Sequence, residues 1–547
     1  MTHRRNQPGI DNPRGVSATW WALLPILLGG CVEHLPISIR LDPEVERPPR
    51  AVVLISVDGF AANKFDQFLD AGDLPNIQRL LVDRGVRVRR AVAGQPTITY
   101  ASFSTILTGR HAGHHGILGN KWFDRYALVF RNYATMATYR WVGDDYLAPN
   151  LFEQLAPAST VSIQNANCRG ATRTIDNWAS SGLRWFVGAF ETVDQLIPLR
   201  MELIAEQANT WGAWPRLIHA YMPAVDEVGH HYGADSPRYR RAAVNVDRQV
   251  GRLFAAVQAA GMTDRTFFVF LSDHGHVPTF PASYFDVAKH LRSAGLTVQD
   301  KPFDARTLEQ RRRHYDNVDA VVIAGGDRRA VIHLPGPGGW HERPQFDTVR
   351  AMIDPTRQSP ATLWENGAVK LALAARHDDD GQRTIEVYSR KGHSRLTRRR
   401  NGDAPVYGYE IVTTDALDGL IPTGLHDAET WLTLTADSPL PDFVVPLVEL
   451  FDSPRAGDIM LVARKDWEFV PHHRGGHGGV DADDVLVPMV FAGPDLPQGA
   501  TIDHARLVDI APTILGLLAG AGDAPPDPST FDGIDRSRQL RATTPPP

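Results

Sequence analysis

The chain is poor in cysteine: its 547 residues include 2, Cys31 and Cys168. Two thiols cannot build the disulfide framework of a small secreted domain or a four-cysteine metal site. An excess of positive charge is also lacking, because 57 Lys and Arg residues face 63 Asp and Glu residues, which gives a net charge of −6. Without a global positive field, no nucleic-acid partner is expected. The 46 glycines and 40 prolines are too few for a low-complexity chain, so the composition is that of a globular protein.

The N-terminal segment has the layout of a secretory signal. Arginines among the first residues precede the apolar stretch VSATWWALLPILLGG, which is too short to span a bilayer comfortably. The ending LLGGC resembles the lipobox of bacterial lipoproteins, in which the cysteine, here Cys31, is lipidated and becomes the first mature residue. We therefore predict a signal peptide over residues 1–30, a tether over residues 31–50, and export to the bacterial periplasm or cell surface with a lipid anchor in a membrane. The alternative is an ordinary cleaved signal with an incidental cysteine.

From residue 51 onward, apolar strands alternate with amphipathic helices. AVVLISVDGF, RLIHAYMP and TFFVFLSDHGH are typical of buried parallel strands, and LPNIQRLLVDRG and LVDIAPTILGLLAG are typical of helices. This alternation predicts an α/β fold over residues 51–280 and 456–540, with a mostly parallel central sheet flanked by helices on both faces.

Between residues 281 and 455 the pattern changes to short hairpin-like runs, which predicts an inserted α+β cap region. Its basic run RKGHSRLTRRR is interpreted as a solvated charged loop, with contact to an anionic surface as the alternative.

Polar side chains follow several of the predicted strands, where ligands of open α/β sheets collect. They are Asp58, Asp226, His230, Asp273, His274 and, in the glycine-rich RGGHGG, His477. Each alone has an ordinary explanation, such as a helix cap, a solvated loop or a packed histidine. Together, three carboxylates and three imidazoles suit Zn²⁺, and six ligands are too many for one tetrahedral ion. The set predicts two divalent ions about 4 Å apart, the clamp used for in-line displacement at phosphorus.

The motifs VVLISVDGF, QPTITYASFSTILTG, HGILGN, VDEVGHH, FLSDHGH and RGGHGG, in this order, resemble the alkaline phosphatase superfamily. The resemblance is specifically to its nucleotide pyrophosphatase/phosphodiesterase branch, and it covers nearly all of the mature chain except the insertion. It implies an alkaline phosphatase-like fold with two zinc ions. By this resemblance, one ion is surrounded by Asp58, Thr99, Asp273 and His274, and the other is held by Asp226, His230 and His477.

Thr99 matches the nucleophile of this family. We expect it at the start of a helix, where free backbone N–H groups and the helix dipole favour a bound anion. A bound cation would also lower the pKa of its hydroxyl, since an unassisted threonine is a poor nucleophile. The nearby competitors are Thr97, which lies before the motif position, and Ser102, which should point away one turn into the helix. Without the metal ligands, Thr99 would be interpreted as a helix cap only.

Two further residues are candidates for substrate binding. Asn120, in HGILGN, matches the asparagine of the branch, whose amide would donate to a nonbridging phosphoryl oxygen and so assist catalysis. Arg169, in NCRGAT, is similar to an Arg-Gly-Ala stretch of some threonine-dependent phosphomonoesterases. Those enzymes carry a lysine two positions earlier, where this chain has Asn167, and this difference argues against full monoesterase chemistry.

The sequence thus predicts a zinc-dependent hydrolase that cleaves phosphodiester or pyrophosphate bonds of a small-molecule phosphoester through a phosphothreonine intermediate. One alternative is a phosphomonoesterase or phosphonate hydrolase on the same core. An alternative from another class is a noncatalytic surface lipoprotein that serves as a binding module. Motifs of zincins, serine hydrolases and P-loop NTPases are missing from the sequence.

Overall fold

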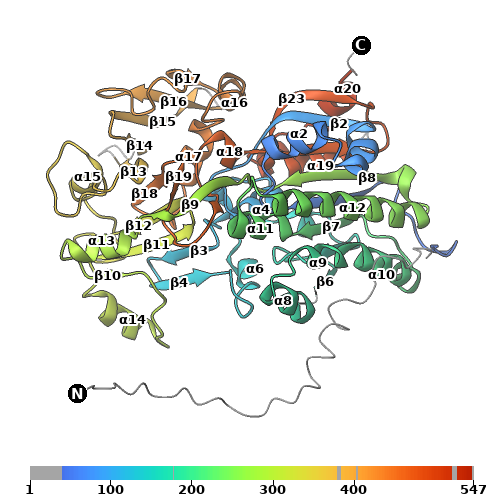
Figure 1. Cartoon of the computed structure of the whole chain (residues 1–547), viewed down its shortest axis with the longest axis horizontal. Helices are drawn as coiled ribbons and strands as arrows, with labels where there is room; N and C mark the ends of the chain where they lie inside the picture. Colours follow the sequence, from blue (N-terminus) through green and yellow to red (C-terminus); the bar gives the residue numbers. More distant parts are fainter. Residues whose placement is uncertain (1–39, 177, 378–382, 402–403, 520–525, 545–547) are drawn as a thin grey trace, which may run out of the picture. The chain divides into compact units, whose positions relative to one another are not determined.

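The computed structural model describes residues 40–176, 178–377, 383–401, 404–519 and 526–544 (Figure 1). The predicted signal peptide over residues 1–30 and the lipidation site Cys31 lie outside the described residues. Residues Ser38–Pro547 belong to one compact unit. Among the described residues, no helix combines the length and the apolar character needed to cross a membrane.

The central sheet is built around β1 (Ala51–Val57), which pairs in parallel with β7 (Leu217–Met222) and with β8 (Thr266–Ser272). All residues of β1 and β8 are buried, which explains why both are continuous apolar runs. The strand order is β21-β2-β22-β8-β1-β7-β5-β6, with β23 paired to β2. The remaining strands are β2 (Gly85–Val92), β5 (Thr160–Ile163), β6 (Arg173–Ile175), β21 (Leu486–Val487), β22 (Met489–Ala492) and β23 (Ala500–Arg506).

This sheet is mostly parallel, as predicted. β21 and β22 pair antiparallel with β2, and β22 also pairs antiparallel with β8. The pairs of β5 with β6 and β7, and of β2 with β23, are parallel. The prediction of a mostly parallel α/β sheet is therefore confirmed.

Helices cover both faces of the central sheet. Side chains of a strand point alternately to these two faces, so the contacts of a single strand identify the helix on each side. Phe267 of β8 belongs to the apolar cluster that contains Phe103 of α4. On the opposite face, the ring of Phe270 stacks on Phe65 of α2 with centroids 5.7 Å apart. The main helices are α2 (Ala62–Asp70), α4 (Thr99–Thr108), α10 (Leu196–Trp211), α11 (Ala224–Tyr232), α12 (Pro237–Ala259) and α19 (Ile510–Ala519).

A second sheet has the order β10-β11-β12-β18-β13-β14-β15-β16-β17, and its pairs are antiparallel except for β10 with β11. Its strands are β10 (Val298–Gln299), β11 (Ala320–Gly326), β12 (Arg329–His333), β13 (Val369–His377), β14 (Arg383–Tyr388), β15 (His393–Asn401), β16 (Ala404–Ile411), β17 (Gly424–His426) and β18 (Ile459–Ala463). Because β18 lies between β12 and β13, this sheet also uses residues beyond 455. The limits 281 and 455 of the inserted region stay a prediction.

The basic run RKGHSRLTRRR forms a strand and not the loop that its charge suggested, although Arg398, Arg399 and Arg400 are exposed as expected. Most of it forms β15, which pairs with β14 and β16. Arg395 contacts Glu386 on the neighbouring strand, and Arg398 contacts Glu449 at 2.7 Å. The loop prediction was wrong because the run pairs with a strand on each edge, and Glu386 and Glu449 form ion pairs with two of its arginines.

A short sheet connects the end of β8 with the glycine-rich RGGHGG segment. β9 (Val277–Tyr284) follows β8 and pairs antiparallel with β20 (Gly475–Gly476) and parallel with β19 (Asp466–Glu468). His477 directly follows β20, and Asp273 and His274 directly follow β8. This pairing therefore brings His477 to the carboxyl end of the central sheet.

Candidate metal centre

The predicted metal ligands leave the carboxyl ends of neighbouring parallel strands. Asp58 follows β1, and Asp273 and His274 follow β8. Asp226 and His230 lie on α11, which begins just after β7, and their spacing of four places both on one face of the helix. Because β7, β1 and β8 are adjacent, these side chains meet at one edge of the sheet.

One group consists of Asp58, Asp273 and His274, whose potential ligand atoms all lie within 4.8 Å of one another. The Nε2 atom of His274 is 3.3 Å from Oδ1 of Asp58 and 3.4 Å from Oδ2 of Asp273. The Oγ1 atom of Thr99 is 3.2 Å from the same Nε2. The structure thus brings Thr99 directly to this group.

The second group consists of Asp226, His230 and His477, again with ligand atoms within 4.8 Å of one another. Oδ2 of Asp226 is 3.1 Å from Nε2 of His230, and Oδ1 of Asp226 is 3.9 Å from Nε2 of His477. The rings of His477 and His274 stack with centroids 3.8 Å apart. The two groups are therefore neighbours.

Burial and mutual repulsion perturb the first group strongly. Burial, followed by repulsion from Asp226, raises the pKa of Asp58, and burial with repulsion from Asp58 raises the pKa of Asp273 well above its usual range. Although burial opposes it, Asp273 and Asp58 raise the pKa of His274 to about 10. Oδ1 of Asp58 and Oδ2 of Asp273 are buried, and apart from the contacts with Nε2 of His274 at 3.3 and 3.4 Å, which lack hydrogen-bond geometry, they have no polar partner among the described residues. Buried carboxylate oxygens of this kind are the atoms that a divalent cation satisfies, so the donor set fits a metal ion.

In the second group, the pKa values of Asp226 and His477 are lowered, whereas those of the first group are raised. Against the effect of burial, His230 lowers the pKa of Asp226 well below its usual range. Burial and the neighbouring His274 lower the pKa of His477 to about 3, which keeps its imidazole neutral. Although burial opposes it, Asp226 raises the pKa of His230 well above its usual range, so this imidazole must lose its proton when a metal ion binds.

Sequence reasoning missed two partners of this second group. His276, in the same FLSDHGH motif, has Nδ1 at 3.2 Å from Oδ1 of Asp226. Asp327, in the turn between β11 and β12, has Oδ2 at 3.2 Å from Nδ1 of His230, which is also 2.8 Å from the carbonyl oxygen of Gly475. His276 lies two residues after the predicted ligand His274, so the sequence could have indicated it. No motif or periodicity around Asp327 indicates a role in the site.

Gly59 explains why the first strand ends in Asp-Gly. Its φ is +63°, and a Cβ at this position would lie 2.4 Å from Oδ1 of Asp226. Only glycine accepts both the left-handed conformation and this close approach. The Asp-Gly pair therefore positions one carboxylate and leaves room for another.

Thr99 is the first residue of α4, as predicted. Its neighbour in the site is Asn120, whose Oδ1 accepts a hydrogen bond from the backbone N–H of Tyr100 at 3.1 Å. This bond places the Asn120 amide at the start of the helix, beside Thr99. Of the competing hydroxyls, Thr97 donates to the carbonyl of Gly479 at 3.0 Å, and Ser102 is buried within the helix.

Arg169 has a different environment from the one expected. Its Nε and Nη2 donate to the carboxylate of Glu153, both at 2.9 Å. Its remaining donors bond the backbone carbonyls of Gly143, Tyr146 and Ala148. A guanidinium has five N–H donors, so these contacts occupy all of them and leave none for a substrate phosphoryl group. The structure does not bring Arg169 into the Thr99 group.

A cavity of about 470 Å³ opens beside Thr99. Most of its lining is aromatic or apolar, and Asn165, Asn167 and Glu227 add polar groups. Its apolar lining residues are Tyr100, Phe103, Tyr133, Ala134, Met136, Tyr139, Ala166, Trp185, Phe186, Val193, Tyr221 and Pro223. The side chain of Phe186 is 88% exposed although it faces this cavity. Such a lining is suited to an aromatic or apolar leaving group next to the nucleophile.

Comparison with known proteins agrees with this geometry. Residues 52–482 match the family described as type I phosphodiesterase / nucleotide pyrophosphatase. An uncharacterised pyrophosphatase/phosphodiesterase of Schizosaccharomyces pombe is 28% identical over 238 residues, or 42% of this chain and 45% of that protein. Human ectonucleotide pyrophosphatase/phosphodiesterase family member 7 is 26% identical over 264 residues, or 46% of this chain and 53% of that protein. The aligned part of the chain spans about half the length of these curated relatives.

Among solved structures, murine ectonucleotide pyrophosphatase/phosphodiesterase 5 is similar, with a TM-score of 0.55 and 17% identity, over 90% of this chain and 100% of that one. An inactive threonine-to-alanine variant of the same murine protein, in complex with AMP, is similar with a TM-score of 0.55 and 16% identity. At this identity the likeness establishes the fold. Because the family match spans most of the chain, the protein belongs to the type I phosphodiesterase / nucleotide pyrophosphatase family, in the alkaline phosphatase superfamily that its motifs resemble.

Proposed function

We propose that this chain is a two-metal phosphoester hydrolase that cleaves phosphodiester or pyrophosphate bonds, with Thr99 as its nucleophile. The observation that carries the proposal is the position of Thr99, which begins α4 and places its Oγ1 atom 3.2 Å from Nε2 of His274 in the first ligand group. Membership of the phosphodiesterase family and the names of its relatives support the same reaction class.

The two ligand groups would hold two divalent ions. Asp58, Thr99, Asp273 and His274 would hold one, and Asp226, His230 and His477 would hold the other. Mixed carboxylate and imidazole donors favour Zn²⁺ over Mg²⁺ or Ca²⁺. When bound, the ions supply positive charge that lowers the pKa of a nearby hydroxyl and offsets the charge that builds on the phosphoryl group and the leaving oxygen.

Residues of the chain attack the phosphorus atom and stabilise the phosphoryl oxygens. The hydroxyl of Thr99 loses its proton to solvent, and its Oγ1 atom forms a bond to phosphorus while the bond to the leaving oxygen breaks and that oxygen takes up a proton. The product is a phosphothreonine that still carries the second substituent of the substrate. The amide NH₂ of Asn120 and the N–H groups at the start of α4, other than that of Tyr100, donate to the nonbridging oxygens as their charge grows. Water then cleaves the phosphothreonine and restores the hydroxyl of Thr99.

The cavity beside Thr99 supports a substrate with an aromatic or apolar leaving group. Its lining provides several aromatic rings but no Lys or Arg. A phosphate monoester arrives as a dianion and needs extra cationic partners, whereas a phosphodiester carries a single negative charge and needs fewer. AMP, which the murine relative binds, combines a phosphoryl group with an aromatic base and is a suitable product analogue to test.

Replacement of Thr99 tests the proposal. With zinc-loaded protein, we expect Thr99→Ala to lower the turnover of a nitrophenyl phosphodiester by about 10³-fold or more, because the nucleophile is lost. Thr99→Ser keeps a hydroxyl and should retain measurable turnover. Metal content, measured by mass spectrometry, should stay near the wild-type value in both variants.

Retained wild-type turnover in Thr99→Ala would refute the assignment of the nucleophile. Faster hydrolysis of the nitrophenyl monoester than of the diester would favour a phosphomonoesterase. Absence of hydrolysis of any phosphoester by zinc-loaded protein would favour the noncatalytic binding module.

We also propose that the protein is exported and anchored to a membrane through lipid on Cys31. The support is the charged, apolar and small-residue order of the N-terminal segment. In a bacterial host, the wild-type chain should fractionate with membranes and incorporate labelled fatty acid. Cys31→Ala should abolish the labelling, and unchanged labelling would show that lipid is attached elsewhere.

A further inference from the structure

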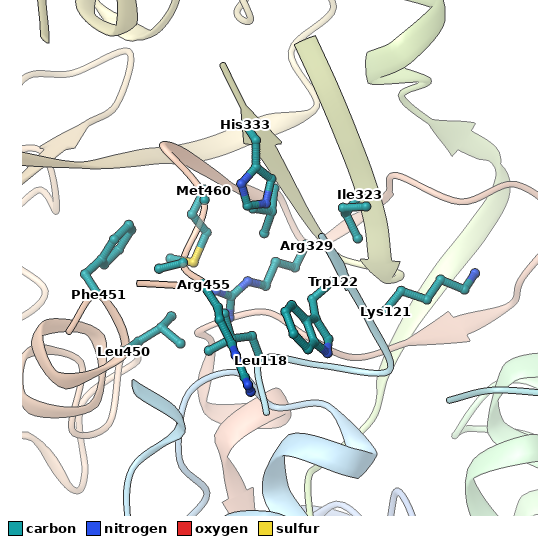
Figure 2. A pocket seen from close by; sticks show the side chains of 13 residues that line it. Leu118, Lys121, Trp122, Ile323, Arg329, His333, Leu450, Phe451, Arg455 and Met460 are labelled. Atoms are coloured by element: carbon teal, nitrogen blue, oxygen red, sulfur yellow. The ribbon is translucent and has the colours of Figure 1, made fainter. Parts of the chain in front are cut away.

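A small cavity lies away from the metal ligands, between the second sheet and the β3 hairpin (Lys121–Asp124 with Val129–Asn132). Its volume is about 30 Å³, which is room for about two water molecules. Figure 2 shows the side chain of Arg329 extending across this cavity toward Arg455.

The lining carries positive charge without any negative charge. Lys121, Arg329 and Arg455 line the cavity together with His333, and the other lining residues that the structure describes are apolar. No Asp or Glu is among them. Lys121 is exposed and Arg455 is half-buried, whereas Arg329 is buried and lacks the counter-charge that buried cations normally have.

Arg329 is the residue that most needs a partner. It is 6% exposed, and its Nε and Nη1 atoms are buried without a hydrogen-bond partner in the described part of the chain. Burial alone lowers the pKa of this guanidinium to about 9, with no carboxylate close enough to oppose the effect. Since arginine stays protonated in proteins, Arg329 carries a buried positive charge that no carboxylate among the described residues neutralises.

The neighbouring residues shape the site. Arg455 donates to the carbonyls of Gly116 and Asp145, both at 2.8 Å, and its guanidinium lies 4.6 Å from the ring centroid of Trp122. His333 is buried, with Nδ1 lacking a hydrogen-bond partner among the described residues. Burial and the nearby Arg125 and Arg343 hold the pKa of His333 well below its usual range, so its ring is neutral. One buried arginine, a second arginine and a neutral imidazole therefore surround a space with apolar walls.

We propose that this cavity binds one monovalent anion of the size of chloride or bromide, with the guanidinium of Arg329 as its main ligand. Water would satisfy the free N–H groups but would leave the charge uncompensated. A space of about 30 Å³ suits a monoatomic ion better than a tetrahedral oxyanion. The apolar walls favour a weakly hydrated ion over a strongly hydrated one.

A bound anion would stabilise the turn between β11 and β12, which borders the candidate metal centre. Arg329 begins β12, directly after Asp327 and Arg328. Asp327 faces His230 at 3.2 Å, and the backbone N–H of Arg328 donates to the carbonyl of His477 at 3.0 Å. An anion that holds Arg329 therefore steadies the turn that contacts both of these histidines.

The test compares thermal unfolding of the full zinc-loaded chain in sodium chloride and in sodium gluconate at equal ionic strength. Wild-type Tm should rise by about 2 °C in saturating chloride, because an anion that binds only the folded state stabilises it. Arg329→Met should lose this rise. In gluconate the variant should be at least as stable as the wild type, because it removes an uncompensated buried charge. Arg313→Met, which changes an exposed arginine of α14 (Leu308–Tyr315), should keep the wild-type response.

Crystals of the wild type grown in sodium bromide provide a second measurement that needs no variant. Anomalous scattering should place a bromide ion against the guanidinium of Arg329. The proposal is overturned if this position holds only water or is empty, or if the wild type and Arg329→Met respond equally to chloride. A phosphate ion at the position would also overturn it, since the site would then select an oxyanion.

Discussion

Asp327 contacts His230, one of the proposed metal ligands, and can position its imidazole without binding the metal itself. His230 directs Nε2 toward Asp226 and Nδ1 toward Asp327, at 3.1 and 3.2 Å. A carboxylate on the distal nitrogen fixes the orientation and tautomer of a metal-binding imidazole and increases its basicity. Despite burial, the charge of His230 holds the pKa of Asp327 below its usual range, so the carboxylate is ionised.

We predict that Asp327→Asn weakens zinc binding by about 10- to 100-fold, because an amide cannot supply the negative charge that holds the imidazole. Titration against a chelator of known affinity measures this effect, and excess zinc should restore most of the turnover. Asp316→Asn, at an exposed position of the same region, should leave zinc affinity unchanged. Wild-type zinc affinity in Asp327→Asn would exclude this positioning role.

At the scale of elements, α5 (Ala112–His115) is joined to α17 (Val444–Leu450) by one histidine. His114 places Nδ1 at 2.6 Å from Asp532, and Nε2 at 3.0 Å from Asp452 and 3.1 Å from Glu449. Although burial opposes it, these carboxylates raise the pKa of His114 to about 11 from an ordinary 6.5. The imidazolium therefore stabilises the folded state fully below about pH 6.5, and this stabilisation is lost as the pH rises toward 11.

We predict that His114→Gln lowers the free energy of unfolding by about 2 kcal/mol near pH 6, because it removes charge-assisted hydrogen bonds. The difference from the wild type should shrink by about pH 9, where the unfolded histidine is neutral and protonation favours folding less. Urea unfolding of both proteins at the two pH values measures this change. His231→Gln, at a more exposed histidine paired with Glu227, should show little difference at either pH. A constant difference across the range would contradict the linkage.

Local sequence predicts the buried strands of the central sheet but not the elements that depend on contacts between distant segments. β1 and β8 were predictable because burial on both faces makes each one a continuous apolar run, and their ends supplied Asp58, Asp273 and His274. β15 was not, because a charged run is typical of a loop, and its pairing with β14 and β16 and the ion pair of Arg398 with Glu449, 51 residues away, form only in the fold. Asp327 reaches the site through a contact between distant segments, and such a contact leaves no periodic signal in the sequence.

At the scale of the whole molecule, the second sheet is joined to the segment after His477 by a buried ion-pair network. Arg328 is 0% exposed and contacts the carboxylate of Asp484, which is also 0% exposed. It contacts Asp481 as well, at 2.9 Å, and Lys370 of β13 contacts that same residue. Because Arg328 adjoins Asp327, this network also fixes the turn that faces His230.

Arg328→Leu should lower the free energy of unfolding by about 3 to 5 kcal/mol, because it leaves the buried carboxylate of Asp484 without a counter-charge, with only the N–H of Gly479 at 3.1 Å to stabilise it. Denaturant unfolding measures the loss. The double variant Arg328→Leu, Asp484→Asn should lose less than the single variant, since the uncompensated charge is gone. Arg313→Leu breaks an ion pair with Glu309 whose side chains are 71% and 76% exposed, and it should cost less than about 1 kcal/mol. Equal losses in Arg328→Leu and Arg313→Leu would mean that the buried network does not hold the second sheet in place.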